Sequence, residues 1–255
     1  MTEGTQQQFA YEWNIYRKIL PIHKEQFCRW IHPIKLEFFK DKTFMDAGCG
    51  IGRNSYWPLL EGAKSGYAFD YDQRTVKVAQ ENLKTFENCT VEYKSIYDID
   101  FENCFDIVFC IGVLHHLQYP RQAIKNLVKA TKTEGTVIFW VYAYEGNEFY
   151  VKWMTPLRQM ITSRLPLPIT RFLSKLLTIF LKIYLLLPQQ KPYFQLLKKM
   201  SFRQIESIVF DQLLPTIANY WKKEEVLQML EELPLKDIQL IHTNDISWTI
   251  VAFKK

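Results

Sequence analysis

This 255-residue sequence contains no C-x-x-C pair and no long apolar run, and its first residues do not show the pattern of a signal peptide. Its cysteines are odd in number, scattered and without a C-x-x-C pair, which argues against a disulfide framework or a zinc ribbon. The first ten residues are polar, and no uninterrupted apolar run reaches the roughly 18 residues of a membrane-spanning helix. We therefore expect a cytoplasmic protein with reduced thiols, no structural metal and no transmembrane segment.

Strand and helix patterns alternate through the first half of the chain. Short apolar runs predict strands, and runs with helical apolar spacing predict helices between them. Such alternation is typical of a doubly wound α/β fold with a mostly parallel sheet. Near the C-terminus, a helix is followed by two strands joined by a short polar connection, as in an antiparallel strand pair. The predicted strands are 42–48, 64–70, 90–94, 105–112, 136–144, 236–245 and 246–255, and the predicted helices are 53–63, 72–86, 120–135 (with Gly135 as its stop) and 222–233.

Three glycines stand at alternate positions in DAGCGIGR, directly after the first predicted strand. The first strand-to-helix turn of such a sheet is where a backbone can wrap a cofactor. A dinucleotide fingerprint, G-x-G-x-x-G, would place its third glycine at position 53, where Arg53 stands. That fingerprint is therefore incomplete.

Carboxylates accompany the glycine turn at two strand ends. Asp46 precedes the glycines, where an acidic residue suits the zwitterionic methionine end of an S-adenosylmethionine-type donor, which has no phosphate. Asp70 ends the second predicted strand, where a carboxylate can accept hydrogen bonds from both ribose hydroxyls. The pair favours this donor over a dinucleotide.

Four motifs in order now resemble a family. DAGCGIGR, AFD, FDIVFCIGVLHHL and TEGTVIFW look like the successive motifs of class I S-adenosylmethionine-dependent methyltransferases, the bacterial small-molecule branch called type 11 or type 12. The resemblance covers roughly 40–143 closely, and 9–13 and 210–226 resemble flanking segments of the family. It implies an α/β, doubly wound, mostly parallel seven-stranded Rossmann-like sheet with an antiparallel last strand and a helical cap insertion.

The resemblance also implies the residues that hold the cofactor S-adenosylmethionine. The family often places an acidic residue near the adenine amino group, but Ser95 and Ile96 occupy the corresponding point and Asp98 comes later. We expect Ser95 and the Ile96 backbone there, with Asp98 as the alternative, and Gly52 in helix-to-strand packing. The implied cofactor-binding residues are Asp46, Gly48, Cys49, Gly50, Arg53, Asp70, Tyr71, Ser95, Ile96 and Cys110.

Two histidines follow the fourth predicted strand, near the path expected for the methyl group. A neutral imidazole could remove a proton from an acceptor hydroxyl, because a neutral alcohol is a poor nucleophile. The catalytic candidates are His115, the nearer to the strand end, and His116. The alternative is that one of them caps or packs under the next helix.

The acceptor class is narrowed by absences. Methylation of amino groups of bases or amides uses an N/D-P-P-Y motif, but CIGV stands at that place. Cys110 lacks the Pro-Cys or Thr-Cys setting of a cysteine nucleophile. We expect O-methylation of a small or lipid-linked acceptor, with an activated carbon left open. The alternatives are an NAD(P)-dependent oxidoreductase or a non-catalytic donor-binding protein acting through its cap. Acceptor contacts are expected from Tyr144, Glu145, Asn147 and Glu148, although a simple loop explains the same residues.

The predicted organisation has three parts. Residues 1–40 form a helical lid with Phe9, Tyr11 and Trp13, residues 41–144 and 216–255 form the core, and residues 145–215 form the cap. Ten Lys and Arg against four Asp and Glu give the cap a charge of +6.

The cap contains one long amphipathic helix, expected within 170–187. Its polar stripe comprises Arg171, Ser174, Lys175, Thr178 and Lys182. The helix either packs on the domain or on a second subunit, or lies at a membrane interface with lysines toward anionic headgroups. A nucleic-acid partner is not expected, since no basic and aromatic stacking run accompanies a known reading motif. The oligomeric state is left open.

Overall fold

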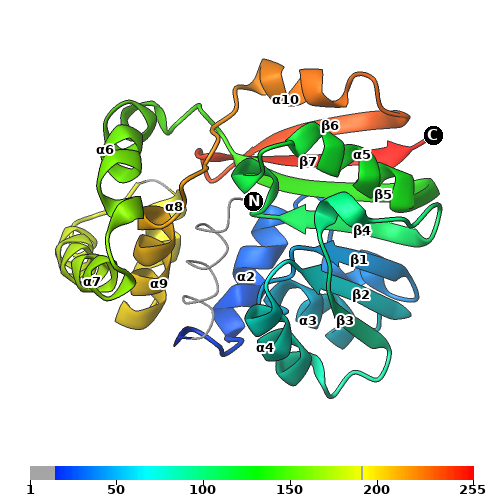
Figure 1. Ribbon diagram of the computed structural model, residues 1–255, viewed down its shortest axis with the longest axis horizontal. Coiled ribbons are helices and arrows are strands. Elements are labelled where there is room, and N and C mark those ends of the chain that lie inside the picture. The colour runs from blue at the N-terminus through cyan, green and yellow to red at the C-terminus, as the bar shows by residue number, and fades with distance from the viewer. Residues whose placement is uncertain (1–14, 191) are drawn as a thin grey trace.

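A computed structural model describes residues 15–190 and 192–255 of the chain, and these residues form one seven-stranded sheet (Figure 1). The strand order is β3-β2-β1-β4-β5-β7-β6, and β7 runs antiparallel to both of its neighbours. The predicted fold class is therefore confirmed. The strands are β1 (Thr43–Ala47), β2 (Ser65–Asp70), β3 (Cys89–Tyr93), β4 (Phe105–Ile111), β5 (Thr131–Tyr142), β6 (Leu235–Thr243) and β7 (Ser247–Lys254).

Helices cover both faces of the sheet (Figure 1). On one face, α2 (Pro21–Trp30), α3 (Arg53–Leu60) and α4 (Gln73–Leu83) enclose an aromatic core in which Phe27 and Phe39 pack against Phe109. On the other face, α5 (Pro120–Ala130) and α10 (Lys223–Leu230) pack over the central strands. Short turns η1 (Leu36–Phe39), η2 (Ile96–Asp98) and η3 (Leu114–His116) complete this part. Because apolar side chains fill both faces, the strands' carboxyl ends remain the place for a cleft.

The boundary between α5 and β5 differs from the prediction. Helix α5 ends at Ala130, and β5 begins at Thr131, whose hydroxyl donates to the Leu127 carbonyl at 2.9 Å. Gly135 therefore lies inside a strand and is not a helix stop. A Cβ at Gly135 would lie 2.8 Å from the Lys132 carbonyl oxygen, so a close backbone approach at an irregular strand start requires the glycine.

A separate lobe of helices lies beside the sheet, at the left in Figure 1. It contains a π-helical turn η4 (Tyr150–Met154), α6 (Thr155–Met160), η5 (Thr162–Arg164), α7 (Leu167–Tyr184), α8 (Pro192–Lys198) and α9 (Phe202–Leu213). Leu185, Leu197 and Ile205 form a small core within it, and Ile22 of α2 packs against that core. This contact ties the lobe to the sheet domain. The division into lid, core and cap stays a prediction, and its lid residues Phe9, Tyr11 and Trp13 lie outside the described residues.

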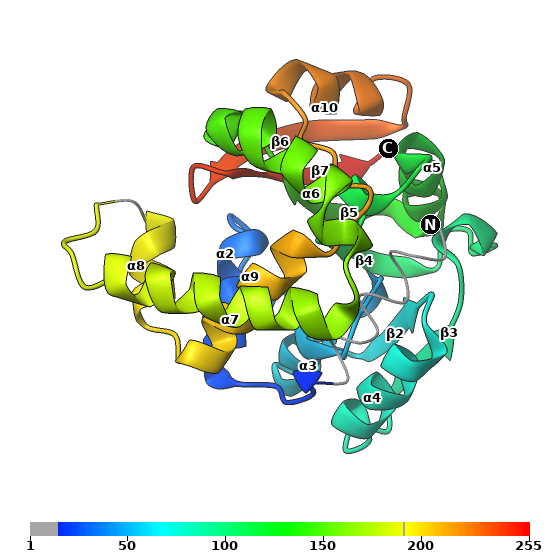
Figure 2. The ribbon, with the colours of Figure 1, turned by 60° about the vertical axis from the view of Figure 1, so that its left-hand side comes forward.

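Helix α7 lies across α9 and packs with most of its polar stripe inward, although Lys175 stays exposed (Figure 2). Ser174 and Thr178 are fully buried, although the sequence suggested a polar surface that could face headgroups. Arg171 also turns toward α9, where its Nε lies 3.6 Å from Glu206 Oε1. Large apolar side chains occupy the outer side instead, among them Phe172 and Phe180.

Candidate active site

A cleft lies along the carboxyl ends of β1, β2, β4 and β5, with the helical lobe as its far wall. Its volume is about 320 Å³, within the range of small-molecule sites. Of the residues expected to hold a cofactor, those that line the cleft are Gly48, Cys49, Gly50, Arg53, Asp70, Tyr71, Ser95 and Ile96. The local sequence after β1, β2 and β3 therefore converges on one cavity.

The glycine turn is compact because neighbouring side chains press against it. Gly48, Gly50 and Gly52 have φ angles of +79°, +55° and +78°, which favour glycine. A Cβ at Gly48 would lie 2.4 Å from Val113 Cγ2, and one at Gly52 would lie 2.8 Å from Leu83 Cδ1 of α4. The absence of a side chain at Gly52 thus lets the start of α3 approach α4. The sequence had predicted a contact between a helix and a strand at this position.

Asp46 precedes the turn, is almost fully buried and does not itself line the cleft. Its Oδ2 accepts a hydrogen bond from the Ser55 hydroxyl at 2.6 Å, whereas Oδ1 is buried with no partner among the described residues. Burial raises the pKa of Asp46 to about 7, and the nearby Asp70 charge adds to the shift. A buried carboxylate oxygen without a donor fits the ammonium group of a bound amino acid.

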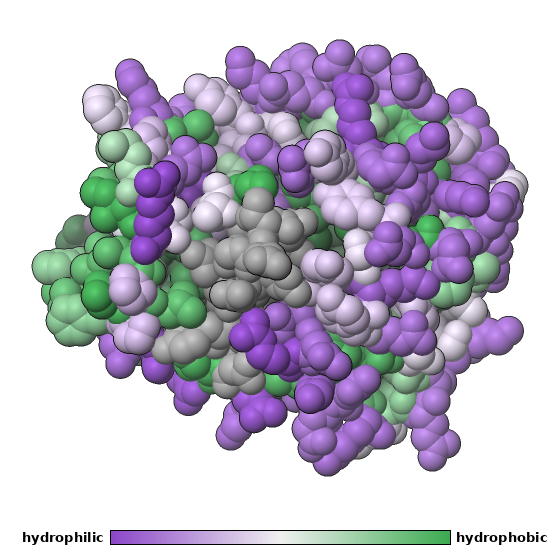
Figure 3. All heavy atoms as spheres, in the orientation of Figure 1, coloured by the Kyte–Doolittle hydropathy of each residue, from purple (hydrophilic) through white to green (hydrophobic). Residues whose placement is uncertain are grey.

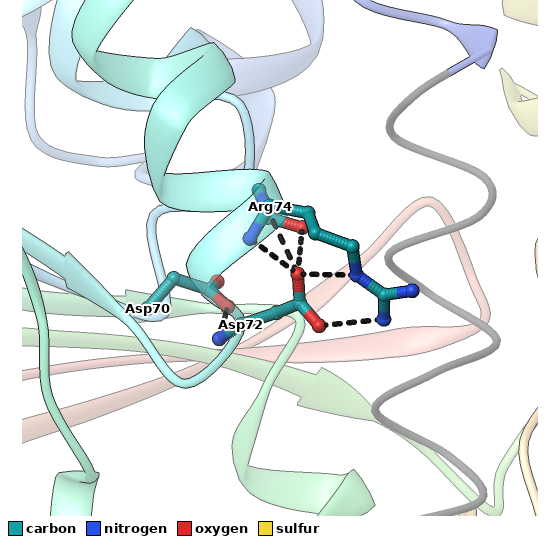
Figure 4. A network of polar contacts seen from close by, with 4 residues as sticks. Asp70, Asp72 and Arg74 are labelled. Carbon is teal, nitrogen blue, oxygen red and sulfur yellow. Dashed lines mark hydrogen bonds and ion pairs between the residues drawn. The ribbon is translucent and has the colours of Figure 1, made fainter.

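Asp70 is fixed at the edge of the turn by two backbone groups. Its Oδ2 accepts from Gly50 N at 3.0 Å, and its Oδ1 accepts from Asp72 N at 3.1 Å. Burial raises the pKa of Asp70 to about 6, against the effect of these hydrogen bonds. In Figure 4 the neighbouring Asp72 points instead to the start of α4, where it accepts from Arg74 N and Thr75 N. The two carboxylates therefore have separate tasks.

The third strand end supplies the side expected for adenine. Ser95 and Ile96 line the cleft together with Tyr97, whereas Asp98 does not. Ser95 Oγ accepts from Tyr97 N at 3.1 Å and so caps the short turn η2. This placement keeps Ser95 and Ile96 ahead of Asp98 as the predicted adenine contacts.

His116 lines the cleft, and its protonation pattern follows from one contact. Its Nδ1 lies 2.7 Å from the Ile217 carbonyl oxygen, which can only accept, so Nδ1 carries the hydrogen and Nε2 carries the ring's lone pair. Burial lowers the pKa of His116 to about 4, which keeps the ring neutral at pH 7. A neutral imidazole with a fixed tautomer can accept a proton from a ligand.

His115 does not line the cleft. It is fully buried, stacks on the Tyr142 ring at 3.8 Å between centroids, and has no hydrogen-bond partner at either ring nitrogen among the described residues. Burial holds its pKa well below the usual range. The order of preference from the sequence, His115 before His116, is therefore reversed by geometry.

The residues expected to contact the acceptor do not line the cleft either. Asn147 Nδ2 donates to the Ala143 and Ile246 carbonyls at 2.9 and 2.7 Å, and Glu145 Oε1 accepts from Lys223 N at 3.1 Å. Tyr144 and Glu148 are likewise absent from the cleft lining. The reason is that the chain leaving β5 is tied to α10 and the β6–β7 turn. The acceptor assignment to this segment stays a prediction, and the cleft lining does not support it.

Cys110, which was expected to help hold the cofactor, also lies away from the cleft. Its side chain is fully buried in the core beneath α5 and is not part of the cleft lining. Alternation along β4 sends Ile111 toward the cavity and Cys110 away from it.

One wall of the cleft comes from the lobe and from α2, and the sequence analysis did not predict it. Asp211 and Gln212 come from α9, Tyr193 from α8 and Trp30 from α2. Burial raises the pKa of Asp211 to about 6, while the positive charges of Arg53 and Arg158 oppose the shift. One signal existed for Asp211: acidic residues are rare in the basic segment 149–215, which contains only Glu206 and Asp211.

Neither a cluster of metal-binding side chains nor a membrane-spanning helix is found among the described residues. Within residues 15–190 and 192–255, no cluster of three or more His, Cys, Asp or Glu side chains could hold a metal ion. Over the same residues, no helix is long and apolar enough to cross a bilayer.

Known proteins share parts of this sequence. Residues 45–139 match the family described as "Methyltransferase domain". The "tRNA U34 carboxymethyltransferase" of Helicobacter pylori (strain G27) is 35% identical over 105 residues, which are 39% of this chain and 40% of that protein. An "Uncharacterized protein syc1184_c" of Synechococcus sp. is 29% identical over 131 residues, 47% of this chain and 31% of that protein. The chain spans less than half the length of these curated relatives.

Solved structures share the fold. A "possible histamine N-methyltransferase" from Thermotoga maritima has a TM-score of 0.58 and 13% identity, covering 98% of this chain and 100% of that one. Human N-acetylserotonin methyltransferase in complex with S-adenosylmethionine has a TM-score of 0.54 and 14% identity, covering 90% of this chain and 51% of that one. The family match over residues 45–139 confirms the resemblance to methyltransferases that the motifs indicated, and the solved structures show that the fold is shared.

Proposed function

We propose that this chain, which carries the fold and domain of a class I S-adenosylmethionine-dependent methyltransferase, transfers a methyl group to an oxygen of a small or lipid-linked acceptor. The observation that supports the choice of oxygen is His116, a neutral imidazole in the cleft wall whose Nδ1 is already engaged by Ile217. A neutral hydroxyl needs such a base, because its oxygen is a poor nucleophile until the proton leaves.

The donor fits the sheet side of the cleft. When bound, S-adenosylmethionine supplies an electrophilic methyl group on a sulfonium. Asp46 Oδ1 would accept from the ammonium of the donor, and Asp70 would accept from its ribose hydroxyls through lone pairs that the backbone leaves available. Arg53, at the start of α3, lies over the Trp30 ring and would meet the carboxylate. These roles use the residues that converge on the glycine turn.

The acceptor fits the side formed by the helical lobe. Trp140, Tyr142 and Tyr193 offer apolar ring surface, and Gln212 Nε2 fixes Tyr142 by donating to its hydroxyl at 2.9 Å. His116 Nε2 would take the hydroxyl proton of the acceptor, and the bound donor would supply the methyl group to the acceptor oxygen and leave as a neutral thioether. Apolar walls limit the entry of water as a competing acceptor.

A transfer assay tests the oxygen assignment. The purified full chain is incubated with methyl-labelled S-adenosylmethionine and, separately, with a lipid extract, a water-soluble small-molecule extract and bulk tRNA. We expect label in the lipid or small-molecule fraction, with mass spectrometry and NMR showing an O-methyl group. Label in tRNA, the molecule in the name of the Helicobacter pylori relative, or an N-methyl or C-methyl product would contradict the proposal.

Donor affinity should depend on pH through the buried carboxylates. Asp46 and Asp70, with pKa values raised to about 7 and about 6, must be ionised to attract a cationic donor. The affinity should therefore be full above about pH 8, weaken up to about tenfold per pH unit below pH 7, and weaken more steeply as Asp70 also protonates. Titration calorimetry from pH 8 to pH 5.5 measures this slope.

Two variants test whether Asp46 causes the dependence of donor affinity on pH. Asp46→Asn should flatten the pH dependence between pH 6 and pH 8. Asp106→Asn should leave it unchanged, because the contacts of Asp106 with Lys132 and Thr43 hold its pKa at about 2, outside the titrated range. A donor affinity that does not change with pH would remove Asp46 and Asp70 from the donor site.

A further inference from the structure

The outer surface of the helical lobe is apolar to an extent seen nowhere else in the described chain. Fifteen of the twenty exposed large hydrophobic side chains of residues 15–190 and 192–255 lie between 149 and 187. On α7 they include Phe172 and Phe180, which are 61% and 68% exposed, and near α6 they include Trp153 and Met160, 59% and 70% exposed. In Figure 3 hydrophobic surface gathers at the left edge, where Figure 1 shows α7. Apolar surface concentrated in this way marks an interaction site.

The inward packing of α7 makes this arrangement stable. Ser174 Oγ donates to the Arg171 carbonyl at 2.8 Å and Thr178 Oγ1 to the Ser174 carbonyl at 2.7 Å, so the buried hydroxyls are satisfied within the helix. Arg171 of α7 also forms an ion pair with Glu206, which is buried on α9. Turning α7 about its axis would bury the apolar side, but it would break the ion pair and leave the charge of Glu206 buried without its partner. The outward apolar face is therefore the packed state of the lobe and not a loosely held one.

The segment that carries that face has charges of only one sign. Residues 149–205 contain ten Lys and Arg and no Asp or Glu. Lys152, Arg164, Lys175 and Lys198 are exposed, and the structure shows no ion pair for them with the described residues. An apolar face with basic neighbours and no acids is complementary to an anionic lipid surface.

We propose that the lobe binds the surface of an anionic membrane, with α7 lying in the headgroup region and its apolar side directed into the bilayer. The helix has 18 residues and so is about 27 Å long, and none of the described helices can cross a bilayer, so the contact is peripheral. This inference goes beyond the proposed methyl transfer, and its test needs no turnover.

Two other occupants fit the surface less well. A symmetric pair of chains joined through this face would place the basic neighbours of one copy against those of the other, without acids to compensate them. An RNA would be attracted by the lysines but would meet a surface whose exposed large side chains are mostly aliphatic, and aliphatic groups offer bases no stacking surface. A bilayer satisfies both the apolar and the basic parts.

Vesicle co-sedimentation of the full chain tests the proposal. We expect binding to phosphatidylcholine vesicles that contain about a quarter phosphatidylglycerol to be at least about tenfold tighter than to pure phosphatidylcholine vesicles, because basic residues add attraction at an anionic surface. The double variant Phe172→Ser/Phe180→Ser should lose at least about tenfold in binding to the anionic vesicles. Lys175→Glu/Lys198→Glu should weaken binding to the anionic vesicles only.

Controls distinguish weaker vesicle binding caused by the changed surface from weaker binding caused by unfolding. Leu60→Ser removes a side chain of similar exposure, 58%, at the end of α3 and should leave vesicle binding unchanged. Circular dichroism and melting of the phenylalanine variant should match the parent chain, because both rings are exposed. The proposal is overturned if neither vesicle binds, or if both bind equally. It is also overturned if light scattering shows a dimer that the phenylalanine variant disrupts without vesicle binding, or if only tRNA binds and does so regardless of the two phenylalanines.

Discussion

His116→Gln is expected to lower kcat by roughly 10²- to 10⁴-fold, the usual contribution of a general base. Glutamine can still donate to the Ile217 carbonyl, which His116 Nδ1 contacts at 2.7 Å, but it has no basic nitrogen for the acceptor proton. The Kd for the donor should stay within about twofold, because the change removes an interaction made in the transition state. Steady-state kinetics with the acceptor found in the transfer assay and calorimetry with S-adenosylmethionine measure the two effects.

The neighbouring histidine provides the comparison. His115→Phe keeps a ring stacked on Tyr142 and removes two buried nitrogens that have no partner in the described structure, so kcat should stay within a few fold. The wild-type rate at saturating donor should also be independent of His116 protonation above about pH 5, since the pKa of that imidazole is lowered to about 4. If His115→Phe lowers kcat strongly and His116→Gln does not, the general base is His115, the residue that the sequence favoured.

The parts of the fold that could be predicted from sequence are those set by local pattern. Alternating apolar runs and helical spacings gave the parallel sheet and its antiparallel last strand, because each element's apolar face follows from its own residues. The end of α5 could not be placed in this way. Gly135 resembles a helix stop, but a close approach to the Lys132 carbonyl inside β5 requires it, and that contact arises only when the strands pair.

The residues of the cleft also fall into a group that local sequence motifs predicted and a group that they did not. The residues after β1, β2 and β3 were found because short motifs place them at strand ends, which a parallel sheet brings to one edge. Asp211, Tyr193 and Trp30 belong to helices whose position depends on how the lobe and α2 pack, and no local pattern encodes that packing. Residues 144–148 lie away from the cleft for a related reason. Asn147 and Glu145 anchor this segment to the β6–β7 turn and α10.

Helix α7 shows a further limit of pattern reading. Its spacing indicates two unlike sides but not which of them faces the protein. Ser174 and Thr178 can be buried because their hydroxyls bond to carbonyls of the same helix, so burial leaves no group unsatisfied. Arg171 can turn inward because Glu206 lies within reach on α9. The outward apolar side therefore became visible only with the partner helix in place.

Asp72 provides the control for the prediction at Asp70, because the two carboxylates are close in sequence but serve different contacts (Figure 4). Asp72 caps α4 by accepting from Arg74 N and Thr75 N at 2.9 and 3.1 Å. Asp72→Ala should therefore destabilise the fold by about 0.5–2 kcal/mol, the usual cost of losing an N-cap. Its effect on donor affinity should be only a few fold. Chemical denaturation and donor calorimetry measure the two quantities on each variant.

Asp70→Asn is expected to show the reverse pattern. The amide oxygen can still accept one of the backbone donors, Gly50 N or Asp72 N, so the free energy of unfolding should fall by no more than about 1 kcal/mol. Donor binding should weaken by about 1.5–3 kcal/mol, roughly 10- to 150-fold in Kd, because the ribose hydroxyls lose a charged acceptor. If Asp70→Asn instead unfolds the chain while leaving the donor Kd unchanged, Asp70 only braces the glycine turn, and the ribose must be held by another residue of the cleft.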